Sequence, residues 1–230
     1  MTATSAGRSR PAEPEGALSV LPEGVVPPAD VPPAIFVAAL QTFLEMRRLD
    51  MRALAAELGM GRSSLYRKVG SRDELLGAVL WYLTRRAIVR AVDASGGLSG
   101  PARVVGVVHH FLHDVHSQAA LRRLLQEEPE AALRILTSKR GVVQQRVIRA
   151  VERLLAEEEA HPDARLTMDR ATLAYVIVRI GESFLYADVI ADNQPDVDRA
   201  VEVVAQLLGT TVPRFPSQAG SRSRDGRQRG

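Results

Sequence analysis

The feature that most constrains the fold of this chain is a helical spacing of apolar residues that continues from Pro33 to Leu208. Phe36, Leu40 and Phe43, for example, recur at i, i+4 and i+7, which places them on one face of an α-helix. No stretch alternates apolar and polar residues with the period of two that is typical of a half-buried strand. The sequence therefore predicts an all-α fold, with a first helix from Pro33 and further helices over 51–58, 62–69, 72–94, 102–117, 119–127, 129–138, 142–159, 167–191 and 195–208.

The segment from residue 49 to residue 76 predicts two short helices joined by a tight turn. Asp50 is a favourable N-cap, because its carboxylate can accept hydrogen bonds from the free amides of the first turn. Gly59 follows the first short helix at the place where a left-handed residue is needed, and Gly70 ends the second. Ser71 and Glu74 have the spacing of a capping box, which opens a long fourth helix. This order of signals predicts a helix-turn-helix arrangement.

The second short helix has one apolar side and one basic, hydroxylic side. Leu65 and Val69 define the side that we expect to be buried. The opposite side suits the major groove of DNA, because small residues permit close approach, arginine can bind guanine through two hydrogen bonds and hydroxyl groups bind phosphate. From Arg47 to Arg72 seven side chains are basic and two are acidic, so positive charge concentrates here. The predicted DNA-binding residues are Arg52, Arg62, Ser63, Ser64, Tyr66, Arg67, Lys68 and Arg72. The alternative is a helical hairpin that only packs, with solvated charges.

The same residues resemble a known family. The strings DMRALA from Asp50, LGMGRSSLYRKV from Leu58 and GSRDELL from Gly70 resemble the helix-turn-helix of TetR-family transcriptional regulators. Two downstream strings, SKRGVVQQ from Ser138 and YVIVRIGESFLYADVI from Tyr175, resemble the QsdR-type branch of that family. The resemblance covers about residues 34 to 208.

The resemblance implies a homodimer in which each subunit presents one recognition helix to half of a palindromic DNA operator. It also implies a C-terminal helical domain that dimerises and binds a small effector, and it suggests a link to the degradation of lactone quorum signals. Three residues depart from the family pattern. Gly61 replaces the usual hydroxylic cap, Lys68 stands where histidine is common and Val69 replaces the usual phenylalanine. These departures bear on operator preference and docking angle.

Composition excludes several classes of protein. The chain has no cysteine, which rules out disulfide scaffolds, thiolate zinc sites and cysteine nucleophiles. It also contains no nucleophile elbow, phosphate loop or paired-carboxylate motif, so we expect no enzymatic activity and no cofactor. No apolar run approaches the length of a membrane span and the N-terminus lacks a leader pattern. We therefore expect a cytoplasmic protein without membrane contact, associated with the nucleoid when it binds DNA.

The predicted helix over 102–117 contains four of the five histidines. His109 and His113 are separated by four residues and His116 lies three further on, so the three can share one face. This spacing permits a metal pair, but HHFLHDVH matches no zinc signature and we predict no metal site. Lining of an effector pocket, or plain packing, is the favoured interpretation of His109 and His113.

The predicted helix over 167–191 places four polar or aromatic residues along one stripe, and they are Tyr175, Arg179, Glu182 and Tyr186. Because burial of a single charge is costly, Arg179 and Glu182 are expected either to pair at a dimer seam or to serve an effector cavity. Trp81 and Tyr82 on the long fourth helix are candidate pocket residues for the same effector, with packing as the alternative.

The sequence thus predicts four parts: a disordered proline-rich arm over 1–32, a helix-turn-helix DNA-binding domain over 33–78, an effector-binding and dimerisation domain over 79–209, and a disordered arginine-rich tail over 210–230. A long helix joins the two domains. The predicted function is a ligand-responsive, dimeric DNA-binding regulator, and a repressor is favoured over an activator. Two alternatives are a helical ligand- or protein-interaction module without DNA binding, and a metal-dependent hydrolase that uses the His109–His116 helix.

Overall fold

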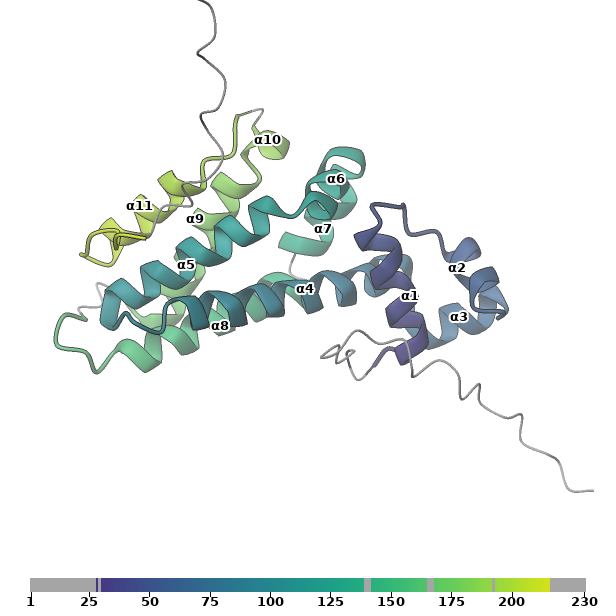
Figure 1. Cartoon of the computed structure of the whole chain (residues 1–230), viewed down its shortest axis with the longest axis horizontal. Helices are drawn as coiled ribbons and strands as arrows, with labels where there is room; N and C mark the ends of the chain where they lie inside the picture. The colour runs from purple at the N-terminus through teal and green to yellow at the C-terminus, as the bar shows by residue number, and fades with distance from the viewer. Residues whose placement is uncertain (1–27, 29, 139–141, 165–167, 192, 216–230) are drawn as a thin grey trace, which may run out of the picture. The chain divides into compact units, whose positions relative to one another are not determined.

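The computed structural model describes residues 28, 30–138, 142–164, 168–191 and 193–215. All regular secondary structure in these residues is helical, which confirms the predicted all-α class (Figure 1). The helices are α1 (Pro33–Leu44), α2 (Met51–Glu57), α3 (Arg62–Val69), α4 (Arg72–Ala94), α5 (Gly100–Ser117), α6 (Ala119–Glu127), α7 (Pro129–Thr137), α8 (Val142–Glu158), α9 (Arg170–Leu185), α10 (Ala187–Ile190) and α11 (Val197–Leu207).

The chain divides into two compact units. The first contains the described residues up to Ala87 and those from Ser117 to Val147, and the second contains Ile88–His116 and the described residues from Ile148 onward. The first unit therefore groups the helix-turn-helix elements with α6 and α7. The four-part division made from the sequence stays a prediction. Most of its expected arm, and residues 216–230 of its expected tail, lie outside the described residues.

The first unit has a core in which α1, α3 and α4 meet. Phe36 on α1, Leu65 on α3, and Leu75 and Val79 on α4 are fully buried. The edge of the Phe36 ring meets the ring of Tyr82 at a centroid distance of 5.3 Å. Phe36 and Leu65 come from the apolar faces that the helical spacing identified, and the burial of Leu65 fixes the side of α3 that remains exposed.

Helix α1 ends in a Schellman motif, in which the chain turns back through a left-handed residue. The Arg47 amide donates to the Thr42 carbonyl and the Met46 amide donates to the Phe43 carbonyl. Met46 occupies the left-handed position, with a φ of 56°. Helix α2 ends in the same way, with Gly59 at the left-handed position at a φ of 61°.

The second unit is built on α5, α9 and α11, which lie side by side (Figure 1). Val105 on α5, Leu173 on α9 and Val204 on α11 are fully buried between them. Gly181 lets α9 approach α5 closely, because a Cβ at this position would lie 3.2 Å from Leu112 Cδ2.

Helix α5 begins at Gly100, two residues earlier than predicted. Pro101 fits this start, because the first turn of a helix does not need its missing amide. Glu158 at the end of α8 fastens this end of α5: its carboxylate accepts a hydrogen bond from the Gly100 amide at 2.6 Å and pairs with the Arg103 guanidinium.

The segment predicted as one helix over 167–191 is two helices, which corrects the prediction. Helix α9 starts at Arg170, where the Asp169 carboxylate caps the Thr172 amide at 2.9 Å. The backbone leaves the helical conformation at Tyr186, with φ −108° and ψ 23°, and α10 adds one short turn. The tyrosine ring at this break is buried, so the chain bends where the side chain enters the core. Among the described residues, none of the helices combines the length and the apolar composition needed to cross a membrane.

Candidate DNA-binding site

Helices α2 and α3 form the predicted helix-turn-helix, and local hydrogen bonds define its turn (Figure 1). Asp50 Oδ1 accepts from the Arg52 amide at 2.7 Å and from the Ala53 amide at 2.8 Å. These bonds, with that from Ala53 foremost, hold the pKa of the Asp50 carboxyl below its usual range. Gly59 then reverses the chain, and only Met60 and Gly61 separate the end of the turn from α3.

Helix α3 exposes the side that the sequence analysis assigned to DNA. Leu65 and Val69 are buried, and Tyr66 keeps 42 % of its surface exposed. The other exposed residues of this side are Arg62, Ser63, Arg67 and Lys68, while Ser64 is half-buried. The Arg67 guanidinium contacts the Ser64 hydroxyl at 3.4 Å, a long and weak hydrogen bond that leaves most of its donors open.

The end of α3 and the start of α4 are fixed by the predicted capping box. The Ser71 amide donates to Glu74 Oε2 at 2.6 Å and the Glu74 amide donates to Ser71 Oγ at 3.1 Å. The bond from the Ser71 amide, followed by the Ser71 side chain, lowers the pKa of the Glu74 carboxyl. Gly70 has a φ of 69°, which strains any residue with a Cβ, and a Cβ there would lie 2.2 Å from Glu74 Oε2, so a side chain would displace the carboxylate of the capping box. The angle between the exposed side of α3 and α4 is therefore set by local chemistry.

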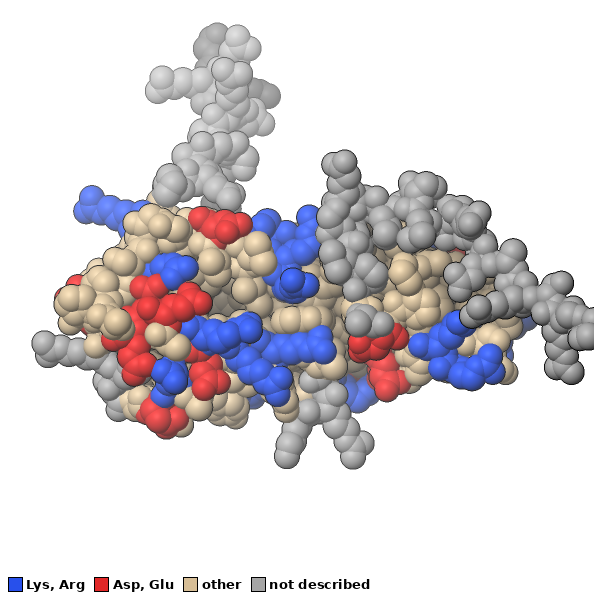
Figure 2. Space-filling view, turned by 90° about the horizontal axis from the view of Figure 1, so that it is seen from below, with Lys and Arg blue, Asp and Glu red and all other residues tan. Residues whose placement is uncertain are grey.

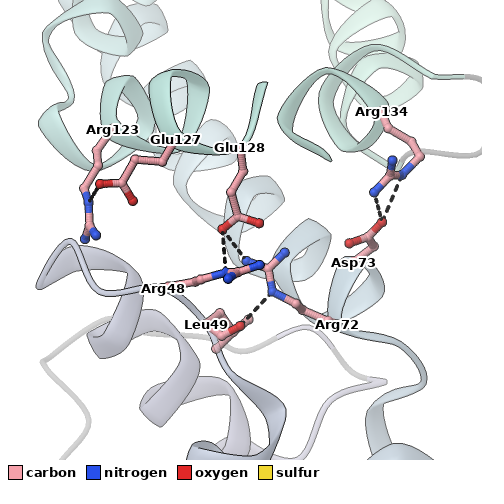
Figure 3. Close-up of polar contacts among 8 residues, drawn as sticks. All are labelled: Arg48, Leu49, Arg72, Asp73, Arg123, Glu127, Glu128 and Arg134. Atoms are coloured by element: carbon pink, nitrogen blue, oxygen red, sulfur yellow. Dashed lines mark hydrogen bonds and ion pairs between the residues drawn. The ribbon is translucent and has the colours of Figure 1, made fainter. Parts of the chain in front are cut away.

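Arg72 has internal partners that no sequence signal predicted (Figure 3). Its Nε donates to the Leu49 carbonyl at 2.7 Å, and its Nη2 donates to Glu128 Oε1 at 2.7 Å. Only 22 % of the side chain is exposed. A guanidinium held in this way has fewer donors left for a phosphate, which differs from the role predicted for Arg72.

Glu128 is the residue between α6 and α7, and it joins those helices to the helix-turn-helix. Besides Arg72, its Oε1 lies 3.5 Å from Arg48 Nε, and only 16 % of the Glu128 side chain is exposed. A second tie lies nearby, where Arg134 on α7 donates to Asp73 on α4 at 2.8 Å (Figure 3). The sequence marked Glu128 only as a helix end before Pro129, and no local signal paired it with residues more than 50 positions earlier.

Overall charge alone does not single out a binding surface. Figure 2 shows Lys and Arg gathered in clusters that are separated by clusters of Asp and Glu on the face it draws. Several cations are paired, as Arg123 is with Glu127 at 2.7 Å. The exposed side of α3 differs because its three cations lie on one short helix that carries no acidic residue.

The candidate effector residues are distributed between the two units. Trp81 and Tyr82 lie in the first unit, where the Arg146 guanidinium stands 5.1 Å from the centre of the Trp81 ring and Tyr82 packs in the core beside Phe36. The Tyr82 ring is buried, which agrees with a role in core packing rather than in lining a pocket. His109, His113 and the four residues of the predicted stripe lie in the second unit.

The four residues of the predicted stripe differ in their exposure to solvent. Tyr175 is 51 % exposed and Tyr186 is buried, where loss of solvation, together with the neighbouring Glu182 carboxylate, raises the pKa of its phenol. Arg179 and Glu182 form the expected pair, with Nη1 and Oε2 2.6 Å apart. Each of the two charged groups therefore has an oppositely charged partner on the same helix.

The histidines of α5 lie beside a residue of α11 that is distant in the sequence. His113 Nε2 lies 2.9 Å from Asp198 Oδ1 on α11, and the rings of His109 and His113 are 4.4 Å apart. The ring of Phe215 stacks on His109 at a centroid distance of 3.8 Å and an interplanar angle of 6°. Burial, followed by the neighbouring histidines, lowers the pKa of His109 to about 4. His109 is therefore a neutral imidazole near pH 7.

Comparisons with known proteins agree with this architecture. The family model of the tetracyclin repressor-like C-terminal domain matches residues 99–209. The structure is similar to that of the TetR-family transcriptional repressor QsdR of R. erythropolis, with 29 % sequence identity, a TM-score of 0.70 and coverage of 79 % of this chain and 96 % of that chain.

A second solved structure shares the fold. It is the TetR-family repressor AlkX of Dietzia sp. strain DQ12-45-1b, with 24 % identity, a TM-score of 0.51 and coverage of 78 % of this chain and 95 % of that one. No functionally curated protein matches the sequence. The C-terminal domain match and the similarity to QsdR over most of both chains lead to one conclusion: this chain has a tetracyclin repressor-like C-terminal domain and is similar in structure to TetR-family repressors.

Proposed function

We propose that this protein is a ligand-responsive repressor that binds a palindromic DNA operator as a homodimer. The observation that carries the proposal is the exposed side of α3, on which Arg62, Arg67 and Lys68 stand with Ser63 and Tyr66. An α-helix fits the major groove, and guanidinium, ammonium and hydroxyl groups are the donors that bases and phosphates accept from. QsdR, to which the chain is similar, is a transcriptional repressor.

The roles divide by chemistry. Arg62 and Arg67 suit guanine edges or phosphates, because a guanidinium presents two parallel donors. Ser63, Ser64, Tyr66 and Lys68 suit phosphate contacts that fix the helix in the groove. Arg52, exposed in the first turn of α2, completes the phosphate-binding set. Arg72 instead links the start of α4 to the segment before α2 and to the junction of α6 and α7, because its guanidinium is hydrogen-bonded to Leu49 and Glu128.

The Glu128 contacts supply a route by which a ligand could alter DNA binding. Glu128 holds Arg72 in the first turn of α4, and Arg134 holds Asp73 in the same turn. A displacement of α6 and α7 would therefore pull on the helix that directly follows α3. A ligand releases DNA in this scheme only if it binds better to the displaced arrangement. The resemblance of the sequence to the QsdR-type branch makes lactones the first class of ligand to test, with loss of operator binding as the measured effect.

The experiment that tests the proposal starts from selection of bound duplexes out of a random-sequence DNA library. We expect a palindromic sequence, bound more tightly than random duplex at the same salt concentration. Arg67→Ala should weaken binding to this sequence by roughly tenfold to a hundredfold, because one good contact to a base is worth about 1–3 kcal/mol. Fluorescence anisotropy measures both affinities.

Arg153→Ala is the matched control, because Arg153 is an exposed arginine on α8, outside the predicted surface. Its affinity for the selected duplex should equal that of the wild type. Selection of no sequence, or equal losses in the Arg67 and Arg153 variants, would contradict the proposal and favour an interaction module without DNA binding.

A further inference from the structure

The second unit contains a group of side chains whose types and positions match a metal site. His109 and His113 come from α5, and Asp198 comes from the first turn of α11. Each offers one ligand atom, and the three atoms lie within 4.8 Å of one another. Two of them, His113 Nε2 and Asp198 Oδ1, are already 2.9 Å apart.

These separations are close to those that a metal ion requires. Ligands bound tetrahedrally at about 2.0–2.1 Å lie roughly 3.4 Å apart, so an ion would need His113 Nε2 and Asp198 Oδ1 to separate slightly and no other pair to approach by more than a modest distance. The side chains have the freedom for it, because 41 % of His113 and 75 % of Asp198 remains exposed. The helical spacing of four residues also keeps both imidazoles on one side of α5.

The ring of His109 is oriented without being blocked. Phe215 stacks on the face of this ring, at an interplanar angle of 6°, and His110 meets its edge region in a T-shaped contact at 5.1 Å. The lone pair of an imidazole nitrogen lies in the plane of the ring, so stacking on the face restricts rotation while leaving that lone pair able to bind an ion. Restricted ligand rings lower the entropy that binding must overcome.

We propose that His109, His113 and Asp198 bind a divalent first-row transition-metal ion of the zinc type. Two imidazoles and one carboxylate suit zinc, cobalt and nickel, whereas magnesium and calcium prefer ligand sets made of oxygen alone. Three protein ligands leave a fourth position for water or for a small oxygen ligand. The ion would join α5 to α11 in one chain, and this role does not depend on DNA binding.

The test is a titration of the untagged full chain, stripped with a chelator, with ZnCl₂ in an isothermal titration calorimeter and in the absence of DNA. We expect one ion per chain. His113→Ala and Asp198→Asn should each weaken zinc binding at least about tenfold, because each removes or neutralises a ligand. His116→Ala is the matched control, since this histidine lies on the same helix but outside the trio, and it should bind zinc like the wild type.

Titration with Co²⁺ gives a second readout that does not depend on the variants. A four-coordinate site should produce the intense visible absorption of tetrahedral cobalt, and zinc should displace it. Absence of this band together with no zinc binding would show that His113 and Asp198 form an ion pair only. Equal loss of binding in the His116 and His113 variants would also overturn the assignment. Neither result would bear on operator binding, so this inference and the proposed function fail separately.

Discussion

At the scale of single residues, the ends of α1 and α2 show the same turn made with different side chains. Both helices close with a Schellman motif, and glycine is favoured at its left-handed position because a Cβ there crowds the backbone. Gly59 meets this demand after α2, but Met46 occupies the position after α1 and is the one non-glycine residue with a positive φ in the described part of the chain. Met46 therefore carries backbone strain.

We predict that Met46→Gly stabilises the protein. Removal of the left-handed penalty is worth about 1–2 kcal/mol, and the greater freedom of glycine in the unfolded state offsets roughly half of this. The free energy of unfolding should therefore rise by about 0.5–1 kcal/mol, as measured by urea denaturation. Met46 is 47 % exposed, so little packing is lost.

The converse substitution, Gly59→Ala, checks the same physics. It should lower the free energy of unfolding by about 1 kcal/mol, although a Cβ at Gly59 would meet no atom within 4 Å. Space is therefore not the reason for the loss. If Met46→Gly destabilised the protein or Gly59→Ala had no effect, the strain argument would be wrong.

At the scale of elements, Glu128 links the junction of α6 and α7 to the start of α4. Its carboxylate faces two guanidinium groups, those of Arg48 and Arg72, and is largely shielded from water. Hydrogen bonds to charged groups in such places are worth more than exposed ion pairs, which contribute little. The neighbouring Glu127 offers a comparison, because its pair with Arg123 is more exposed.

We predict that Glu128→Gln lowers the free energy of unfolding by about 1–2 kcal/mol, because it leaves the Arg72 guanidinium without a charged partner. Glu127→Gln, one position earlier, should cost less than about 0.5 kcal/mol. Urea denaturation of both variants measures the difference. Equal effects of the two substitutions would mean that the Glu128 contacts do not stabilise the junction.

At the scale of the whole molecule, the proposed repressor acts as a pair of chains. Each chain supplies one α3, and a palindromic operator matches the twofold symmetry of a homodimer. Contacts to phosphates from both chains release counterions together, so affinity should fall steeply as salt rises.

We predict that light scattering of the complex shows two chains per selected duplex. A plot of log affinity against log salt should be linear, and Lys68→Ala should make its slope shallower by about two, which is one phosphate contact per chain. The same variant should lose affinity about equally for selected and random duplexes. An unchanged slope would show that Lys68 does not contact a phosphate.

The sequence alone determined the features that depend on residues a few positions apart. Asp50 caps amides two and three residues later, Ser71 and Glu74 bond across three positions, and the side of α3 opposite Leu65 and Val69 is exposed as the spacing predicted. Helical period, capping and glycine turns are short-range effects, so they can be identified before the chain is folded. This is why nearly every helix and the turn between α2 and α3 could be predicted.

Only the tertiary structure decided which distant residues meet. Glu128 pairs with Arg72, 56 positions earlier in the sequence, and His113 contacts Asp198, 85 positions later. Phe215, which follows α11, stacks on His109. The break at Tyr186, inside a segment with an unbroken helical pattern, likewise accompanies burial of its ring. Side-chain pairing between elements follows from how the helices pack, and helical spacing gives the face of each helix but not the neighbour that the face will contact.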